Sequence, residues 1–142
     1  MKTHSFACYC ATLRQAARAV TLLYEKVIAE GGLHATQYTA LQLIEAAPNL
    51  TTTELAEAMG IDQTTATRTL ALIKGRGLAT NTIGQDRRRR RWNLTSAGQE
   101  KLRKLTPRWE AAQRTLEIRL GRAQAIVLKD AAYLTASRIG SR

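Results

Sequence analysis

The sequence predicts a mainly α-helical protein with one small β-hairpin. Apolar residues recur at steps of three and four over long stretches near both ends of the chain, which is the period of an amphipathic helix. Two shorter helical segments near the middle are spaced like the two helices of a helix-turn-helix motif. After them, two extended runs, 78–83 and 90–94, flank a polar turn, which is typical of a hairpin.

The first third of the chain contains two expected helices. A stripe at helical spacing predicts a helix over 6–30, which the glycine pair at 31–32 ends. Thr36 is in position to cap a second helix over about 37–46, and Pro48 prevents its continuation. The apolar residues of these helices are Phe6, Cys10, Leu13, Ala17, Val20, Tyr24 and Val27 in the first, and Tyr38, Leu41 and Ile44 in the second.

The helix-turn-helix pair follows a short extended stretch at 50–51. Thr53 is expected to cap the first helix of the pair, and Gly60 is expected to close it. Asp62 then caps the second helix, which runs over about 63–75.

Long helices are also expected at the C-terminal end. Thr95 or Ser96 begins a helical region that Pro107 should kink and Gly121 should break, and a final helix follows over about 123–138. The apolar stripes of the terminal helices are too long to be buried within so small a chain. The sequence therefore predicts a homodimer in which the terminal helices of two subunits pack together.

The net charge of the chain indicates what kind of partner it binds. The 142 residues carry 22 Lys+Arg against 11 Asp+Glu, a formal net charge of +11. An excess of this size favours an anionic partner, either nucleic acid or an acidic membrane surface. No stretch approaches the roughly 18 consecutive apolar residues of a membrane span, and no signal-peptide pattern is present. The two cysteines, Cys8 and Cys10, are too close together to staple a secreted scaffold, so we expect a cytoplasmic protein without membrane contact.

The helix-turn-helix segment offers a surface for reading DNA. Its apolar residues are spaced to form a joint core of two helices, and Gly60 permits the tight turn between them. Threonine and glutamine hydrogen-bond to base edges, and arginine binds guanine bidentately. An ordinary helical hairpin with a solvated face is the alternative. The expected core residues are Leu55, Ala56, Ile61, Leu70 and Ile73, and the expected DNA-binding residues of the second helix are Gln63, Thr64, Thr65, Thr67, Arg68 and Lys74.

Five consecutive arginines follow Asp86 and strengthen the DNA interpretation. In an extended strand Trp92 and Leu94 point toward the core side, and guanidinium groups are left at the protruding tip. Such groups suit the narrow, negative minor groove of A/T-rich DNA, and Asp86 is expected to hold one of them by an ion pair. A solvated charge run is the alternative, but five adjacent arginines repel one another without a polyanion. The expected wing contacts are Arg87, Arg88, Arg89 and Arg90.

These motifs together resemble the MarR family of winged helix-turn-helix regulators. The resemblance rests on the succession LAEAMGI, DQTTATRTLALIKGRGL, D-x-R and WNLTSAG and extends over nearly the whole chain. Its most specific part is Asp86 and Arg88, eight and six residues before the Leu94-Thr95 pair, followed by Gly98.

The resemblance implies a homodimer that places helix 63–75 in the major groove and the wing in the minor groove of a pseudo-palindromic operator. It also implies a repressor from which a ligand or an oxidant, acting in the crevice between the lobes, releases the DNA. We accordingly divide the chain into an N-terminal dimerisation helix over 1–34, a winged helix-turn-helix lobe over 35–98 and C-terminal dimerisation helices over 99–142, in one compact domain overall.

The two cysteines raise the question of whether an oxidant is the signal that releases such a regulator from DNA. The arrangement of Cys10, Tyr24 and Tyr38 resembles the hydroperoxide-sensing branch of the same family, in which tyrosines hydrogen-bond to an N-terminal cysteine. The chain departs from that branch at Ala35, where a second tyrosine is expected, and it has no C-terminal cysteine to act as the resolving partner. Two alternatives stay open: Cys10 is a small buried hydrophobe, or it binds a soft metal together with Cys8.

The sequence shows no catalytic constellation and no glycine-rich phosphate loop, so we expect neither an enzyme nor a cofactor or metal site. Trp109, which follows Pro107, would line an effector crevice or pack at the kink. The predicted function is a sequence-specific, dimeric, DNA-binding transcriptional regulator, a repressor released by a small-molecule ligand or by thiol oxidation. The alternatives are a nonspecific architectural DNA-binding protein and a thiol-based, peroxide-reactive enzyme.

Overall fold

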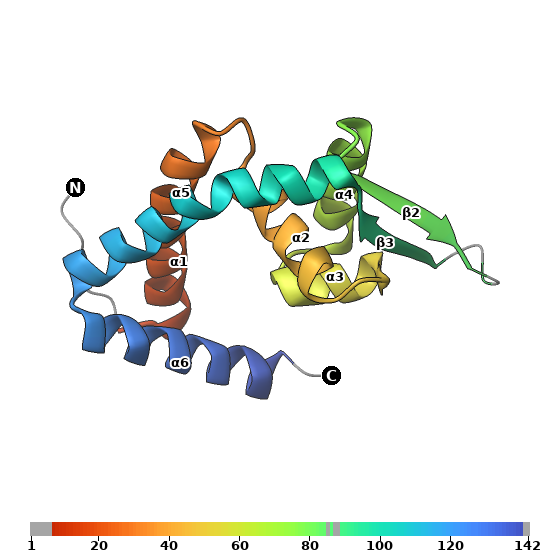
Figure 1. The fold of residues 1–142 in the computed structure, drawn as a ribbon. Coiled ribbons are helices and arrows are strands. Elements are labelled where there is room, and N and C mark those ends of the chain that lie inside the picture. The colour runs from red at the N-terminus through yellow and green to blue at the C-terminus, as the bar shows by residue number, and fades with distance from the viewer. Residues whose placement is uncertain (1–6, 85, 87–88, 141–142) are drawn as a thin grey trace. The chain divides into compact units, whose positions relative to one another are not determined.

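The computed structural model describes residues 7–84, 86 and 89–140 (Figure 1). The mainly α fold with a small β-hairpin is confirmed. Six helices and three short strands follow one another along the described chain: α1 (Tyr9–Ala29), α2 (Ala35–Ala46), β1 (Leu50–Thr51), α3 (Thr52–Met59), α4 (Gln63–Gly75), β2 (Ala79–Ile83), β3 (Arg90–Leu94), α5 (Ser96–Leu120) and α6 (Arg122–Ile139).

The chain forms two compact units. The central unit comprises residues 28–107, and the terminal-helix unit comprises residues 1–27 and 108–142. The expected lobe over 35–98 lies wholly within the central unit, which also includes the end of α1 and the first half of α5. The assignment of the terminal helices to dimerisation stays a prediction.

The core of the central unit is built from α2, α3 and α4. The inward positions predicted for α2, namely Tyr38, Leu41 and Ile44, are at most 2% exposed. The predicted joint core of the helix-turn-helix is buried at Leu55, Ala56, Leu70 and Ile73, whereas Ile61 is only half-buried because it lies in the connection between the two helices.

Two predicted helix caps are wrong, and one is confirmed. Thr51, not Thr53, caps α3: its hydroxyl oxygen accepts from the Glu54 amide, and its own amide donates to the Glu54 carboxylate at 2.7 Å. This reciprocal pair is a capping box, and it places the cap two residues earlier than predicted. His34, not Thr36, precedes α2, and its amide donates to the Gln37 side chain at 3.0 Å. Asp62 caps α4 as predicted, by accepting from the Thr65 amide.

The sheet is antiparallel with the strand order β1-β3-β2, so β3 is its central strand. Trp92 on β3 is paired with Leu50 on one side and with Asn81 on the other. The β2–β3 hairpin, called the wing below (79–94), projects beyond the helices of the central unit (Figure 1). At its base, a Cβ on Gly98 would lie 1.9 Å from the Leu78 carbonyl oxygen, so only glycine fits where α5 meets the end of the wing.

The terminal-helix unit consists of most of α1, the second half of α5, and α6. Helix α5 continues past Pro107, and the boundary between the two units falls at this residue. The predicted break at Gly121 is confirmed: its φ of 89° separates α5 from α6. Phe6, predicted to begin the stripe of α1, lies outside the described residues.

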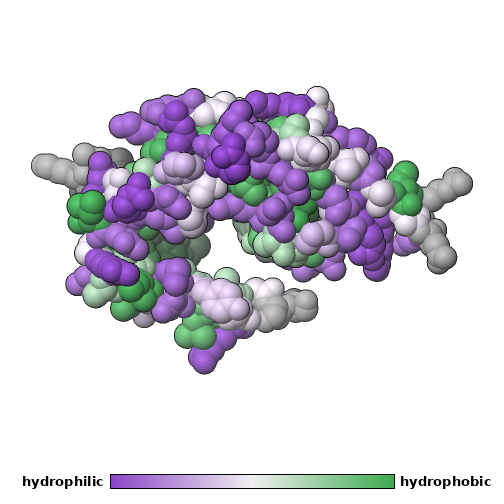
Figure 2. Space-filling view, viewed as in Figure 1, coloured by the Kyte–Doolittle hydropathy of each residue, from purple (hydrophilic) through white to green (hydrophobic). Residues whose placement is uncertain are grey.

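Many large apolar side chains of this unit are exposed in the single chain, and hydrophobic surface along its helices is visible in Figure 2. They include Tyr9, Ile118, Val127, Tyr133 and Ile139, each at least 67% exposed. Among the helices that the structure describes, none is long and apolar enough to cross a membrane.

Candidate DNA-binding surface

The turn between α3 and α4 fixes the face that α4 presents. Gly60 adopts a left-handed conformation with φ of 66°, and the Ile61 amide donates to the Ala56 carbonyl at 3.1 Å to complete the turn. A residue with a Cβ is strained in this conformation. Because Leu70 and Ile73 are fully buried, the opposite face of α4 is turned to solvent.

All predicted DNA-binding positions on α4 are exposed: Gln63, Thr64, Thr65, Thr67, Arg68 and Lys74. The structure distinguishes among them. The Thr65 hydroxyl donates to the Asp62 carboxylate at 2.6 Å, and the Thr67 hydroxyl donates to the Gln63 carbonyl at 2.8 Å. Hydrogen bonds from Thr65 lower the pKa of Asp62, which keeps this cap charged. The hydroxyl hydrogens of Thr65 and Thr67 are therefore both used in hydrogen bonds within the protein. The guanidinium of Arg68 makes no hydrogen bond to another described residue.

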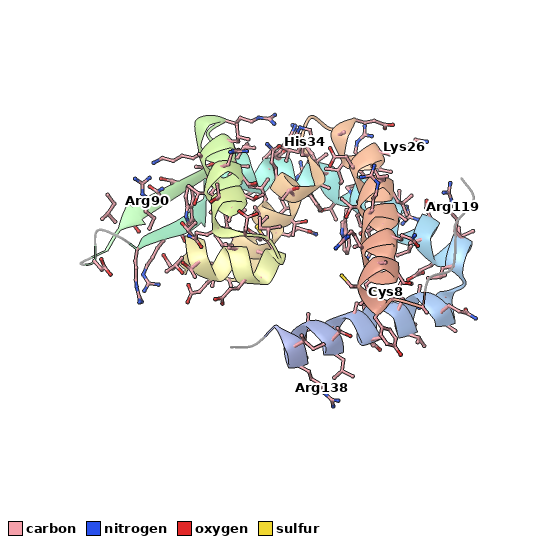
Figure 3. All side chains as sticks on the ribbon, turned by 180° about the vertical axis from the view of Figure 1, so that it is seen from behind. Cys8, Lys26, His34, Arg90, Arg119 and Arg138 are labelled. Atoms are coloured by element: carbon pink, nitrogen blue, oxygen red, sulfur yellow. The ribbon has the colours of Figure 1, made fainter. Side chains whose placement is uncertain are left out.

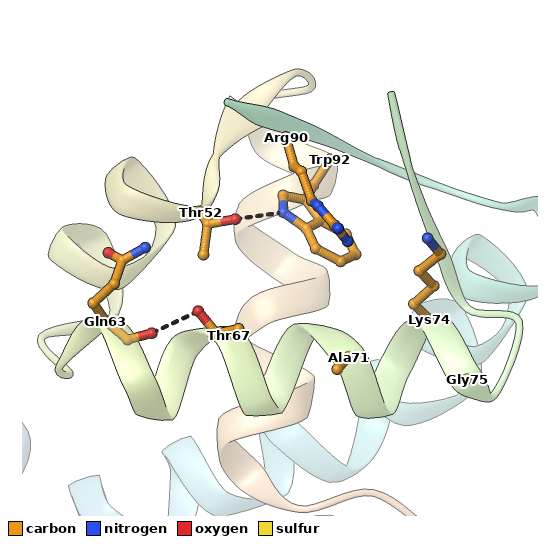
Figure 4. A pocket seen from close by; sticks show the side chains of 8 residues that line it. All are labelled: Thr52, Gln63, Thr67, Ala71, Lys74, Gly75, Arg90 and Trp92. Carbon is orange, nitrogen blue, oxygen red and sulfur yellow. Dashed lines mark hydrogen bonds between the residues drawn. The ribbon is translucent and has the colours of Figure 1, made fainter. Parts of the chain in front are cut away.

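A groove of about 650 Å³ lies between α4 and β3 (Figure 4). We call it the α4–β3 groove. The side chains that line it come from the start of α3, one face of α4 and one face of β3: Thr52, Gln63, Thr67, Ala71, Lys74, Gly75, Arg90 and Trp92. Lys74 is held at its edge, where the Nζ donates to Asn81 Oδ1 at 3.1 Å. The two cations at the groove, Lys74 and Arg90, make it suited to an anionic group.

The arginines of the wing are not equivalent. Arg90 lies on the same face of β3 as Trp92 and lines the groove. Arg91 points to the other face, where its Nη1 donates to the Asn49 carbonyl at 3.0 Å. Arg89 forms an exposed ion pair with Asp86 at 3.7 Å. Arg87 and Arg88, two of the predicted contacts, lie outside the described residues.

The base of the wing is fastened to the start of α3 through Trp92, which the sequence placed on the core side, and through Thr52 and Asn49, which the sequence reasoning did not single out. The Trp92 indole donates to Thr52 Oγ1 at 2.9 Å, and Trp92 is only 4% exposed. Asn49, with a left-handed φ of 69°, donates its amide to the Trp92 carbonyl and accepts from the Asn93 side chain at 3.0 Å. The available signal was local: an asparagine after a proline, which tolerates this conformation.

The capping carboxylate of α3 lies in the field of the wing arginines. Hydrogen bonds from Thr51 lower the pKa of Glu54 most, and the charges of Arg91 and Arg89 lower it further. The acid therefore stays ionised beside the cations and holds the cap.

Both cysteines, Cys8 and Cys10, are exposed, and Cys8 lies directly before the first residue of α1 (Figure 3). The alternative of a buried Cys10 is therefore wrong for the single chain: the end of the stripe that carries Cys10 is exposed, whereas Val20, Tyr24 and Val27 further along are half-buried. The guanidinium of Arg14 lies beside Cys10, where its Nη2 donates to the Cys10 sulfur at 3.5 Å. Among the described residues, no group of three or more His, Cys, Asp or Glu side chains is arranged to hold a metal ion.

The three aromatic residues predicted to take part in sensing, Tyr24, Tyr38 and Trp109, lie in different environments. The Tyr24 hydroxyl donates to the Gln113 side chain, and burial, followed by the charge of Glu117, raises the pKa of Tyr24. Tyr38 is buried in the core of the central unit, and Trp109 on α5 is half-buried.

The terminal-helix unit contains a second, more apolar cavity of about 730 Å³ between α1, α5 and α6. Ten of its sixteen lining residues are alanine, leucine, valine or isoleucine, and its polar groups come from Thr21, Tyr24, Gln113, Glu117, Lys129 and Thr135.

A helix-turn-helix with an exposed second helix, flanked by an arginine-bearing hairpin, defines a winged helix-turn-helix protein. The MarR family model matches residues 31–90. The M. tuberculosis transcriptional regulator MosR is 31% identical, with a TM-score of 0.81, and the match covers 95% of this chain and 98% of that one. The chain belongs to the MarR family of transcriptional regulators.

Two further similar structures contain a bound partner, DNA in one and a small-molecule ligand in the other. MosR in complex with DNA is 31% identical, with a TM-score of 0.73 and coverage of 93% of this chain and 99% of that one. The PcaV regulator of Streptomyces coelicolor in complex with its natural ligand is 25% identical, with a TM-score of 0.80 and coverage of 97% and 99%. A search of curated proteins gives no match.

Proposed function

We propose that the chain is a cytoplasmic transcriptional repressor that binds operator DNA as a homodimer and is released by a signal. The observation that carries this proposal is the exposed face of α4 beside the cationic α4–β3 groove, in a chain with a net charge of +11. A helix held in this way fits the major groove, and an arginine-bearing hairpin fits the adjacent minor groove. The DNA complex of the similar MosR supports the same assignment.

The homodimer is supported by the terminal-helix unit. Its apolar side chains are exposed along α1, α5 and α6, and its cavity is lined mostly by alanine and larger aliphatic side chains. Contiguous apolar surface of this kind marks an interaction site, and a twofold copy presents the same surface in return. Two reading helices in one dimer then contact two half-sites on one face of the duplex.

The DNA assignment is tested by selecting duplexes from a random-sequence library with the purified protein. We expect a pseudo-palindromic consensus whose half-sites are about 10 bp apart, roughly one helical turn. Arg68→Ala should relax the preference at one position of each half-site, because arginine reads guanine through two hydrogen bonds. Equal affinity for selected and random duplexes would instead assign a nonspecific architectural protein.

Thiol oxidation is the second candidate for the signal, beside a small-molecule ligand. It is favoured by the exposure of Cys8 and Cys10 and by the guanidinium of Arg14 at the Cys10 sulfur. Hydrogen peroxide should then release selected DNA from the wild-type protein and fail to release it from Cys10→Ser. Equal release from both proteins would remove this candidate, and continuous turnover of peroxide with a reductant would point to a thiol enzyme.

A further inference from the structure

The exposed residues of α4 form two stripes that face different surroundings. Gln63, Thr67 and Lys74 recur at steps of four and seven and line the α4–β3 groove together with the wing. Thr64 and Arg68, four residues apart, are exposed and do not line the groove. Residues spaced in this way lie on one face of a helix, so α4 presents one stripe to the wing and another outward.

We propose that the α4–β3 groove seats the sugar–phosphate backbone of one DNA strand, and that Thr52 is its neutral hydrogen-bond donor to a phosphate oxygen. This inference rests on the proposed DNA binding. A duplex whose major groove holds α4 and whose neighbouring minor groove holds the wing has one strand between the two elements. The groove is the space that this strand occupies, and Lys74 and Arg90 bring positive charge to it.

The hydroxyl of Thr52 is oriented by its partner. Its oxygen accepts the indole hydrogen of Trp92 at 2.9 Å (Figure 4). Its own hydrogen is left to donate to a group bound in the groove, which Thr52 lines. Trp92 is buried and paired on both sides within the sheet, which fixes the indole. Trp92 is therefore a positioning residue that acts through Thr52, and it also ties the wing to the start of α3.

Thr52→Val tests the donor because valine keeps the branched shape and removes the hydroxyl. The probe is a 24-bp duplex obtained by selection with the wild-type protein, with binding measured over a range of salt concentrations. We expect the dissociation constant to rise about tenfold, as a hydrogen bond to a charged group would give. Thr52→Ser should restore wild-type affinity, and Thr53→Val, an exposed neighbour on α3, should bind like the wild type.

The salt dependence separates this role from that of a cation. A neutral donor displaces no counterion, so Thr52→Val should leave the salt slope unchanged, whereas Lys74→Gln should lower it by about 1. Single methylphosphonate substitutions then locate the contact. At one phosphate of each half-site the neutral linkage should weaken the wild type, and there Thr52→Val should cause no further loss.

The outcomes are distinct. If the wild type selects no duplex, the proposed function fails, independently of the groove. If the wild type binds and Thr52→Val binds equally well, the groove assignment is overturned. It is also overturned if the loss in Thr52→Val is the same at every methylphosphonate position, because the substitution then acts through the fold. Trp92→Phe should show the same phosphate-specific loss as Thr52→Val, with circular dichroism confirming that it is folded.

Discussion

The two units of the chain differ in how completely they bury their own apolar residues. Among the described residues, fifteen of the seventeen buried apolar side chains belong to the central unit. Ten of the twelve exposed large apolar side chains belong to the terminal-helix unit. The central unit buries a hydrophobic core by itself. The terminal-helix unit leaves many apolar side chains of its helices exposed, because it has too few residues of its own to cover them.

This difference indicates a division of roles. The central unit holds α4 and the wing by a packed core, a capping box and a three-stranded sheet, so that the DNA-binding surface is formed before DNA arrives. The terminal-helix unit gains its remaining burial from another molecule, which we take to be a second copy of the chain. Stability of the second unit should therefore depend on protein concentration, and stability of the first should not.

The largest effect is expected from a charge on the apolar surface of the terminal-helix unit. Ile126 on α6 is 45% exposed and lines the cavity between α1, α5 and α6. Ile126→Asp should prevent dimerisation, because a buried unpaired carboxylate is costly. Losing the second, tethered half-site should weaken operator binding by about 10²–10⁴-fold. Sedimentation and gel-shift titration measure both effects.

A matched control at the same position is Ile126→Leu, which keeps the volume and adds no charge and should therefore stay dimeric. A dimeric Ile126→Asp protein with full operator affinity would show that this surface is not the interface.

The comparison also explains what the sequence could predict. Periodicity and caps were enough for α4, because Asp62, the buried stripe and the closing glycines are all local. The start of α3 was misplaced because three adjacent threonines can each cap a helix. Only Glu54, three residues after Thr51, decides among them.

Contacts between distant segments could not be predicted in this way. The Trp92–Thr52 hydrogen bond joins residues forty positions apart, and Arg91 is bound to Asn49 across a similar distance. The run of five arginines predicts a strong positive charge, but the sequence alone does not show which of these arginines lines the α4–β3 groove. Of the predicted stripe on α1, Leu13, Ala17, Val20 and Tyr24 line the cavity between α1, α5 and α6, whereas Cys10 is exposed. Spacing identifies such a face but cannot say whether the residues that cover it belong to the same molecule.

The next largest effect is expected when the same isoleucine-to-alanine truncation is made in each unit and the loss in the free energy of unfolding is compared. Ile73→Ala removes a fully buried side chain from the central unit and should cost about 2–5 kcal/mol in the free energy of unfolding. Ile118→Ala removes one that is 81% exposed in the single chain. At dilutions where the protein is monomeric, its cost should be within about 0.5 kcal/mol.

Denaturant titrations at two protein concentrations separate these cases. The loss in Ile118→Ala should grow with concentration if the partner subunit covers this side chain, whereas the loss in Ile73→Ala should not change. Equal losses for the two variants in the dilute monomer would contradict the contrast between the units.

A smaller effect is expected at the base of the wing. A Cβ at position 98 would lie 1.9 Å from the Leu78 carbonyl oxygen, which is backbone and cannot swing away. Gly98→Ala should therefore destabilise the central unit by about 1–3 kcal/mol, as overpacking does. Gly75→Ala is the control, because its Cβ meets nothing within 4 Å and alanine favours the helix. Thermal unfolding should show a lower Tm for Gly98→Ala alone.

The smallest effect concerns a polar contact inside the terminal-helix unit. Tyr24 donates to Gln113, and Tyr24→Phe should cost about 0.5–1.5 kcal/mol, the usual contribution of one hydrogen bond. Tyr9→Phe is the matched control in the same helix, since Tyr9 is 88% exposed, and it should leave stability unchanged.

The pH dependence gives this contact a signature. Burial and the charge of Glu117 raise the pKa of Tyr24 above its ordinary value near 10, so the folded protein keeps the phenol proton to higher pH than the unfolded chain. The contribution of Tyr24 to stability is therefore complete below about pH 10 and declines as the pH rises through the folded-state pKa. Urea titrations between pH 8 and about 11 should show that Tyr24→Phe loses this decline while Tyr9→Phe retains it. An identical alkaline decline in both variants would mean that the phenol of Tyr24 is as free to ionise in the folded unit as in the unfolded chain.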